Sequence, residues 1–234
     1  MTEGAALPTA SEEAKRRAAQ AALAYVPEAG ILGLGTGSTT RYFIEAVAKL
    51  VAGGRRLQAV PTSEQSRELA ARLGIPLLDN DGPWEIAVCV DGADEVSATL
   101  DLIKGGGGAH TREKIVNFAA RKNVIIIDGS KLSDRLGEKR AVPVEVLAFA
   151  HLTTAHALTR FGKPTLRRRG EEPFRTDSGN YIYDLAVEPI QSPALVDNEL
   201  RRVPGVVETG LFCGRADLVL VAEAQGIRQL VRAP

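Results

Sequence analysis

The first 130 residues alternate between short apolar runs and longer segments in which apolar residues recur at helical spacing. The apolar runs, which we predict to be strands, cover 30–35, 57–60, 85–90 and 124–127. The segments with helical spacing cover 11–26, 38–51, 64–73 and 112–120, and Ser11 is the expected N-cap of the first. Because the strands are apolar throughout rather than alternating, they are typical of a parallel sheet that helices cover on both faces. We therefore predict a Rossmann-like α/β domain.

The pattern changes after about residue 133. Segment 142–146 alternates, 150–161 and 192–202 show helical spacing, and short strand-like runs cover 165–169, 173–176 and 181–186. This mixture predicts a smaller, ferredoxin-like α+β domain with an antiparallel sheet. Buried strand character returns at 206–212 and 218–221, where we expect the chain to rejoin the first domain. The predicted division is 1–132 plus 206–234 for the first domain and 133–205 for the inserted one.

Composition favours a soluble protein with a small-molecule partner. Lys plus Arg and Asp plus Glu each number 29, so the formal net charge is zero and nothing favours a nucleic-acid or membrane partner. The one basic cluster, 167–169, fits a solvated turn or strand end better than a polyanion site. No apolar run approaches the roughly 18 residues of a membrane span, and residues 1–10 lack the features of a signal peptide. Cys89 and Cys213 lie beside apolar residues, so we expect free, buried thiols and a cytoplasmic location.

The strongest chemical signal is the run of four glycines that follows Lys104 and precedes Glu113. Consecutive glycines carry no Cβ, so their backbone N–H groups can close around an anion. The residues after the run begin a predicted helix, and its first turn would carry Glu113. A flexible linker is the alternative, but strand and helix patterns lie close on both sides. An anion cradle, a cation and a carboxylate within ten positions indicate catalysis rather than binding alone.

Three further turns follow predicted strands. Segment 36–39 opens a helix whose free N–H groups and hydroxyls suit a phosphate, although neither the dinucleotide fingerprint nor the P-loop motif is complete. Asp91 and Asp94 could bind sugar hydroxyls or transfer protons, and segment 128–131 adds the second lysine, Lys131. Ligands bind beyond the carboxyl ends of parallel strands. We therefore predict that these turns and the glycine run open onto one rim.

Each of these features also has a structural interpretation. Segment 35–39 could be a plain tight turn, Asp91 or Asp94 could cap a turn, and Lys131 could be a surface lysine. A metal site at the two aspartates is weakly supported, because no histidine or further carboxylate lies at ligand spacing. His110 is the histidine nearest the glycine run, and we predict that the other two histidines are structural.

Taken together and in order, the motifs resemble those of ribose-5-phosphate isomerase of the A type. The matching segments are 35–39, 90–95, 104–107 with 111–114, 128–131, 174–181 and 204–212. The resemblance covers nearly the whole chain. It implies an aldose–ketose isomerase without metal or cofactor that interconverts D-ribose 5-phosphate and D-ribulose 5-phosphate through a cis-enediol, in the non-oxidative pentose phosphate pathway. It also implies a homodimer or a tetramer.

The resemblance assigns Glu113 as the catalytic base. The positions that it implies for substrate contact are Thr36, Gly37, Ser38, Thr39, Asp91, Gly92, Ala93, Asp94, Lys104, Gly105, Gly106, Gly107 and Lys131. The chemistry of an isomerisation agrees with these assignments. Lys104 and glycine N–H groups can stabilise an enediolate oxygen, and Asp91 and Asp94 can assist opening of the sugar ring. We expect the phosphate on Ser38, Thr39 and Lys131, or on the glycine loop if the ligand lies in the opposite direction.

The chain departs from the family pattern at His110, where a small or aliphatic residue is usual. Two other functions stay open. An amino-sugar-phosphate deaminase is similar in overall fold and would need a histidine near the base, for which His110 is the only candidate. A non-catalytic sugar-phosphate sensor would need a DNA-binding module, for which the first ten residues leave no room, and an intact Glu113 argues against it.

Overall fold

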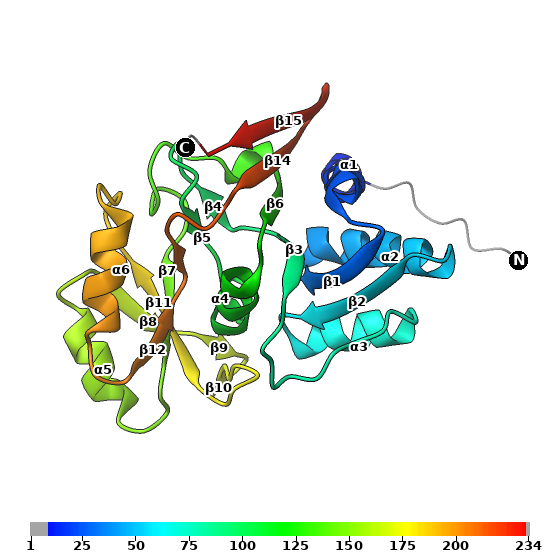
Figure 1. The fold of residues 1–234 in the computed structure, drawn as a ribbon. Helices are drawn as coiled ribbons and strands as arrows, with labels where there is room; N and C mark the ends of the chain where they lie inside the picture. Colours follow the sequence, from blue (N-terminus) through cyan, green and yellow to red (C-terminus); the bar gives the residue numbers. More distant parts are fainter. Residues whose placement is uncertain (1–8, 233–234) are drawn as a thin grey trace, which may run out of the picture.

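The computed structural model describes residues 9–232 (Figure 1). Our expectation that residues 1–10 lack a signal peptide concerns a segment of which 1–8 lie outside the described residues. Within 9–232, no helix combines the length and apolar character needed to cross a membrane.

The helices of this range are α1 (Ala10–Ala22), α2 (Ser38–Ala52), α3 (Glu64–Arg72), α4 (His110–Ala119), α5 (His151–Leu158) and α6 (Pro193–Arg201), with 3₁₀ turns η1 (Leu23–Tyr25) and η2 (Gly129–Lys131). The larger sheet contains β1 (Ala29–Leu34), β2 (Arg56–Pro61), β3 (Ile86–Asp91), β6 (Asn123–Asp128), β14 (Leu218–Glu223) and β15 (Gly226–Val231). Its order is β15-β14-β6-β3-β1-β2. All neighbours pair in parallel except β14 and β15, which form an antiparallel hairpin.

Strand β6 shows why the larger sheet needs cover on both faces. Val124 and Ile126 pack into one apolar cluster, with residues of α1 and α2, whereas Ile125 and Ile127 pack into another on the opposite face. Side chains alternate between the two faces of a strand, so an unbroken apolar run buries both. The parallel α/β fold predicted from these runs is confirmed.

The smaller lobe is a four-stranded antiparallel sheet with α5 and α6. Its strands are β7 (Val142–Val146), β8 (Lys163–Leu166), β11 (Tyr181–Ala186) and β12 (Val206–Thr209), in the order β12-β7-β11-β8. Short pairings complete the fold: β9 (Arg168–Arg169) with β10 (Glu172–Pro173), and β5 (Leu102–Ile103) with both β4 (Glu95–Val96) and β13 (Leu211–Phe212). Figure 1 shows α4 in the middle of the molecule, between the two sheets.

Two expectations about boundaries were wrong. The N-cap of α1 is Thr9, not Ser11, because Thr9 and Glu12 form a reciprocal capping box. Segment 206–212 does not rejoin the larger sheet, because β12 pairs with β7 in the smaller sheet and β13 pairs with β5. By strand pairing, the chain returns to the larger sheet only at β14, and the division into two domains stays a proposal. Cys89 and Cys213 are free, the first buried and the second half-buried.

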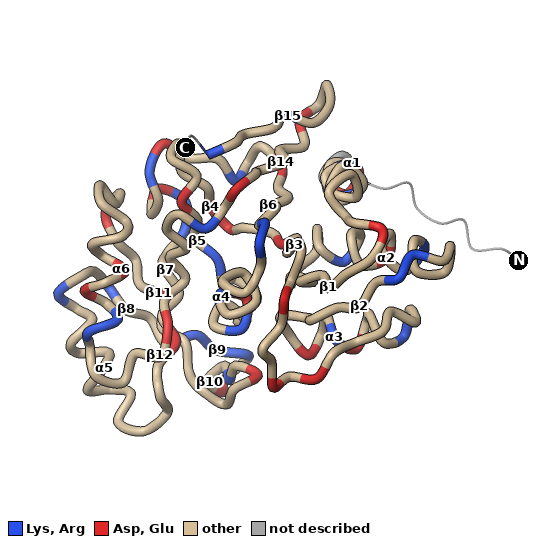
Figure 2. The backbone as a smooth tube through the Cα atoms, in the orientation of Figure 1, with Lys and Arg blue, Asp and Glu red and all other residues tan. Residues whose placement is uncertain are grey.

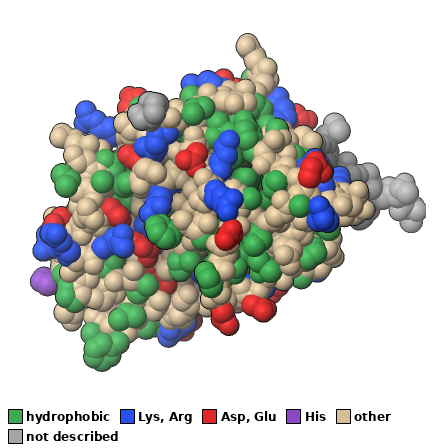
Figure 3. All heavy atoms as spheres, in the orientation of Figure 1, with side chains coloured by type: hydrophobic (Ala, Val, Ile, Leu, Met, Phe, Trp, Pro, Cys, Tyr) green, Lys and Arg blue, Asp and Glu red, His purple; other side chains and the backbone are tan. Residues whose placement is uncertain are grey.

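Charged residues of both signs are spread along the backbone of both lobes (Figure 2). On the face drawn in Figure 3, charged side chains of both signs lie between apolar side chains. This mixture agrees with the net charge of zero in the sequence.

Candidate active site

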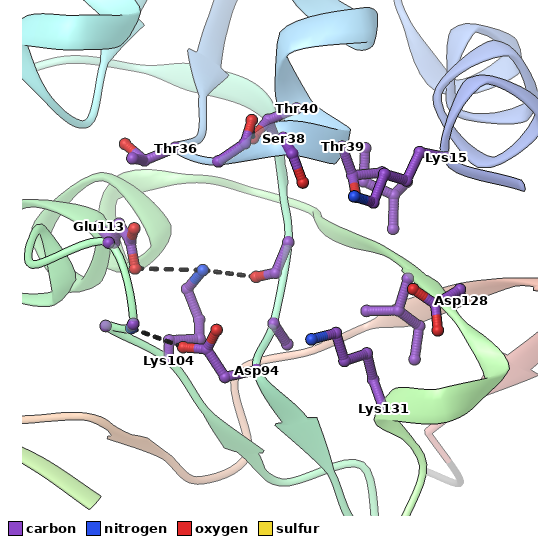
Figure 4. Close-up of a pocket in the computed structure, with 18 of the residues that line it drawn as sticks. Lys15, Thr36, Ser38, Thr39, Thr40, Asp94, Lys104, Glu113, Asp128 and Lys131 are labelled. Carbon is purple, nitrogen blue, oxygen red and sulfur yellow. Dashed lines mark hydrogen bonds and ion pairs between the residues drawn. The ribbon is translucent and has the colours of Figure 1, made fainter. Parts of the chain in front are cut away.

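The predicted rim exists as a pocket of about 300 Å³ between the turns that follow the strands (Figure 4). All four turns named from the sequence contribute to its wall, as the rule for parallel sheets requires. Among the predicted site residues, those that line it are Thr36, Gly37, Ser38, Thr39, Gly92, Ala93, Asp94, Lys104, Gly105, Gly106, Gly107, Glu113 and Lys131. The structure therefore brings together every predicted position except Asp91.

Lys104 lies at the centre of a buried charged group. Its Nζ is 2.9 Å from Asp91 Oδ2 and 3.2 Å from Glu113 Oε2, and it donates a hydrogen bond to the carbonyl oxygen of Gly92. All three charged side chains are at most 4% exposed. Asp91 comes from the end of β3, Lys104 from the loop after β5, and Glu113 from the first turn of α4. One buried cation thus pairs with two buried carboxylates.

Burial sets the protonation of Glu113. Loss of water raises its pKa to about 8, although Lys104 favours the carboxylate and opposes that rise. Burial disfavours the charge of Lys104 as well, but Asp91 and Glu113 outweigh it and raise the lysine pKa. Glu113 Oε2 accepts no hydrogen bond within residues 9–232, and its nearest charged neighbour is Lys104. This carboxyl can therefore both take and return a proton near neutral pH.

Asp91 lies behind the pocket wall rather than on it. Its Oδ1 accepts the N–H groups of Thr36, at 3.0 Å, and Gly92, at 2.7 Å, and the side chain is buried. Burial raises the pKa of Asp91, while Lys104 and these two N–H groups favour its charged form. The turn-capping interpretation holds for this aspartate. It fixes the 35–36 turn and Lys104, and our expectation that Asp91 contacts substrate finds no support in this geometry.

The glycine loop is packed closely on both sides. Gly105 has φ +108°, and a Cβ there would lie 2.7 Å from Nδ1 of His110. The N–H of Gly106 donates to Asp94 Oδ2 at 2.7 Å, and the N–H of Gly108 donates to the carbonyl oxygen of Gly105. Two of the four glycine N–H groups are thus already engaged. The anion cradle predicted from the sequence is narrower than expected, with Gly105, Gly107 and Lys104 as the remaining donors.

Arg167 holds this loop from the smaller lobe. It donates to the carbonyl oxygen of Gly105 at 2.7 Å and forms a two-point ion pair with Asp184. Its side chain is only 15% exposed. Arg167 follows the end of β8, as one of the two expectations for the 167–169 cluster had it, but its side chain is not solvated, because it contacts Gly105 and Asp184.

The opposite side of the pocket is open and rich in donors. Helix α2 begins after Gly37, which has φ +121° and, as a glycine N-cap, offers no side chain to the first N–H groups. Ser38 and Thr39 lie at this helix start, Lys131 on η2 and Lys15 on α1 (Figure 4). A helix start with nearby lysines is suited to a phosphate group. The hydroxyl of Thr36 is directed elsewhere, to hydroxyls of Thr62 and Ser63 at 2.7 and 2.8 Å.

Lys15 is the lysine of the pocket wall that the sequence did not reveal. It lies one helical turn after Ser11, and both line the pocket. The only local signal was this i, i+4 spacing on a predicted helix. The packing of α1 against α2, β6 and β14 brings Lys15 to the pocket, and that packing is not readable from the local pattern.

His110 lies beneath the glycine loop and does not line the pocket. It is fully buried, its Nε2 lies 3.3 Å from the carbonyl oxygen of Glu208, and its Nδ1 has no hydrogen-bond partner within 9–232. Burial and the nearby Lys114 lower its pKa to about 3, so the ring is neutral. In the same range, no group of three or more His, Cys, Asp and Glu side chains is arranged to hold a metal ion.

Comparison with known proteins places the chain and its fold in one family. The family described as "Ribose 5-phosphate isomerase A (phosphoriboisomerase A)" matches residues 58–226. The ribose-5-phosphate isomerase A of Thermomicrobium roseum is 45% identical over 226 residues, covering 95% of each chain, and that of Trichormus variabilis is 41% identical over 223 residues, covering 93% of this chain and 94% of its own.

Solved structures agree with the sequence relatives. The ribose 5-phosphate isomerase A of Methanocaldococcus jannaschii has a TM-score of 0.90 at 36% identity, over 95% of this chain and all of its own. A D-ribose-5-phosphate isomerase in complex with phospho-erythronic acid has a TM-score of 0.91 at 39% identity, over 96% of this chain and all of its own. The chain belongs to the ribose 5-phosphate isomerase A family.

Proposed function

We propose that Glu113 is the base with which this chain interconverts D-ribose 5-phosphate and D-ribulose 5-phosphate. The observation that supports it best is the position of Glu113, buried beside the pocket with Lys104 Nζ 3.2 Å from one carboxylate oxygen. An aldose–ketose isomerisation needs one group that removes a proton and returns it to the neighbouring carbon. A carboxylate with a raised pKa suits both steps.

The chemistry follows from the two charges. The Glu113 carboxylate takes the proton from C2 of the open-chain aldose, and the C–H electron pair forms the C1=C2 bond of a cis-enediolate. The C1 carbonyl oxygen gains the negative charge, which Lys104 and the free glycine N–H groups stabilise. Return of the proton from Glu113 to C1, with proton transfer from the C2 hydroxyl to the C1 oxygen, gives the ketose. Asp94, on the pocket wall, is placed to bind sugar hydroxyls during ring opening.

The phosphate lies at the other end of the pocket in this proposal. Ser38 and Thr39 at the start of α2, with Lys131, are the groups expected from the sequence, and Lys15 joins them from α1. The carboxylates near the glycine loop disfavour a dianion there, so they support this orientation over the reverse one. The deaminase alternative loses its candidate histidine, because His110 is neutral, buried and absent from the pocket wall.

The test compares wild type, Glu113→Gln and the control Glu85→Gln in the presence of EDTA, with ribose 5-phosphate as substrate. Glu85 is exposed on the surface and pairs with Arg121. We expect Glu113→Gln to lose about 10²- to 10⁴-fold in kcat, with the control unchanged. Retained activity in Glu113→Gln would overturn the assignment of the base, and inhibition of the wild type by EDTA would overturn the metal-free reaction.

We also propose that the chain acts without a nucleic-acid or membrane partner, in the cytoplasm, as a homodimer or a tetramer. The charge balance and the family resemblance support this. Light scattering coupled to size-exclusion chromatography measures the assembly directly, and a monomer at micromolar concentration would contradict it.

A further inference from the structure

Glu145 is a buried carboxylate with no cation beside it. It lies on β7 in the smaller lobe, is 1% exposed, and belongs to none of the ion pairs found among residues 9–232. Three neutral groups donate to it: the Thr111 hydroxyl at 2.6 Å, the Thr176 hydroxyl at 3.0 Å and the Asn180 side-chain amide at 2.8 Å. A buried charge costs stability compared with an apolar residue of similar size. The three hydrogen bonds offset part of this cost, and they join three segments that are far apart in the sequence.

The turn that carries Thr176 and Asn180 makes a second contact with the start of α4. Arg112 donates to the carbonyl oxygen of Asp177 at 3.1 Å and to Glu64 at 2.6 Å. Asp177 in turn accepts the first N–H of α3, from Glu64, at 2.9 Å. Thr111 and Arg112, the two residues before Glu113, are therefore both tied to this turn or to its partner Glu145.

The start of α4 has no side-chain cap, because its N-cap is Ala109, and the glycine loop precedes it. Its other contacts come from His110, whose Nε2 lies 3.3 Å from the carbonyl oxygen of Glu208, and from Lys114, which donates to the carbonyl oxygen of Thr209 at 2.8 Å.

On the pocket side, Glu113 Oε2 lies 3.2 Å from Lys104 Nζ and accepts no hydrogen bond within residues 9–232. Successive residues of a helix point about 100° apart. Thr111 is held by the smaller lobe, and Arg112 is held between the 176–180 turn and Glu64 of α3. These two contacts therefore contribute to the rotation of this turn, which directs Glu113 into the pocket.

We propose that Glu145 is a positioning residue for the isomerisation: through the Thr111 hydroxyl it fixes the first turn of α4 and so the place of the Glu113 carboxylate. This inference rests on the proposed role of Glu113. It assigns a catalytic purpose to segment 174–181, whose Thr176 and Asn180 complete the set of donors around Glu145.

The test uses Thr111→Val, which removes the hydroxyl and keeps the shape, and Thr111→Ser, which restores the hydroxyl. The control is Thr153→Val, because Thr153 is exposed on α5. Since a misplacement of about 1 Å can cost 10²-fold, we expect kcat of Thr111→Val to fall about 10- to 100-fold. KM should stay within about twofold, because the phosphate contacts lie on the other side of the pocket, and Thr111→Ser should recover most of kcat.

Two outcomes would overturn the inference. One is a kcat for Thr111→Val that matches the control, with or without a lower melting temperature, since that leaves the hydroxyl a purely structural role. The other is an equal loss of kcat in Thr111→Ser. Measuring Glu113→Gln alongside separates the positioning role of Glu145 from the role of Glu113 as base. If only Glu113→Gln loses activity, the positioning role fails and the assignment of the base stands. If Glu113→Gln stays active, the proposed base itself fails.

Discussion

The two ends of the pocket differ in their contact with water. At one end, Asp91, Lys104 and Glu113 are buried and already paired. At the other end, Lys15 and Lys131 are half-buried and Ser38 is exposed. Electrostatic interactions are stronger where water is excluded. We call the end with Asp91, Lys104 and Glu113 the dry end and the end with Lys15, Ser38 and Lys131 the wet end. The dry end is therefore suited to the proton transfer, and the wet end is suited to binding and releasing a charged phosphate.

The largest effect should come from the dry end. Lys104→Met removes the cation that faces the developing enediolate and leaves Asp91 and Glu113 buried without compensation. We expect kcat to fall at least about 10²- to 10³-fold, as when one oxyanion donor is lost. Steady-state kinetics checks this, with circular dichroism to show that the variant is folded. A folded variant whose kcat falls less than about tenfold would show that Lys104 is not the enediolate's main partner.

The pH dependence of wild-type kcat/KM should report the ionisation of Glu113 at the dry end. Glu113 acts as a base only when deprotonated, and its pKa is about 8. We therefore expect kcat/KM to fall about tenfold for each pH unit below that value and to level off above it. The substrate phosphate ionises at roughly 6, so its own titration is separated from this limb. A kcat/KM that is flat from pH 6 to 9 would contradict a raised pKa at the base.

The sequence predicted the turns of the pocket better than the side chains that tertiary packing brings to or behind it. The catalytic rim was predictable, because each of its turns follows an apolar strand and the carboxyl ends of parallel strands share one edge. Lys15 and Glu145 were not, because their positions depend on how α1 and β7 pack against distant segments. Segment 142–146 suggested alternation, but all five residues are buried, Glu145 among them. Partners of a buried polar residue are set by tertiary packing, which local periodicity does not encode.

The smallest effect should come from the wet end, and it sharpens the comparison most. Lys15→Met and Lys131→Met each remove one cation near the start of α2, where we place the phosphate. A lost hydrogen bond to a charged group costs about 1.5–3 kcal/mol in a buried setting and less in water, so we expect each variant to raise KM about tenfold. Because a contact made equally in the ground and transition states leaves kcat unchanged, kcat should stay within about twofold.

The control for both variants is Lys163→Met, on an exposed position of β8. The limb of the pH profile should also stay near 8 in both variants, since neither lysine contacts Glu113. A shift of that limb, or a loss in kcat as large as that of Lys104→Met, would mean that the two ends act as one electrostatic unit and that the division between chemistry and binding is wrong.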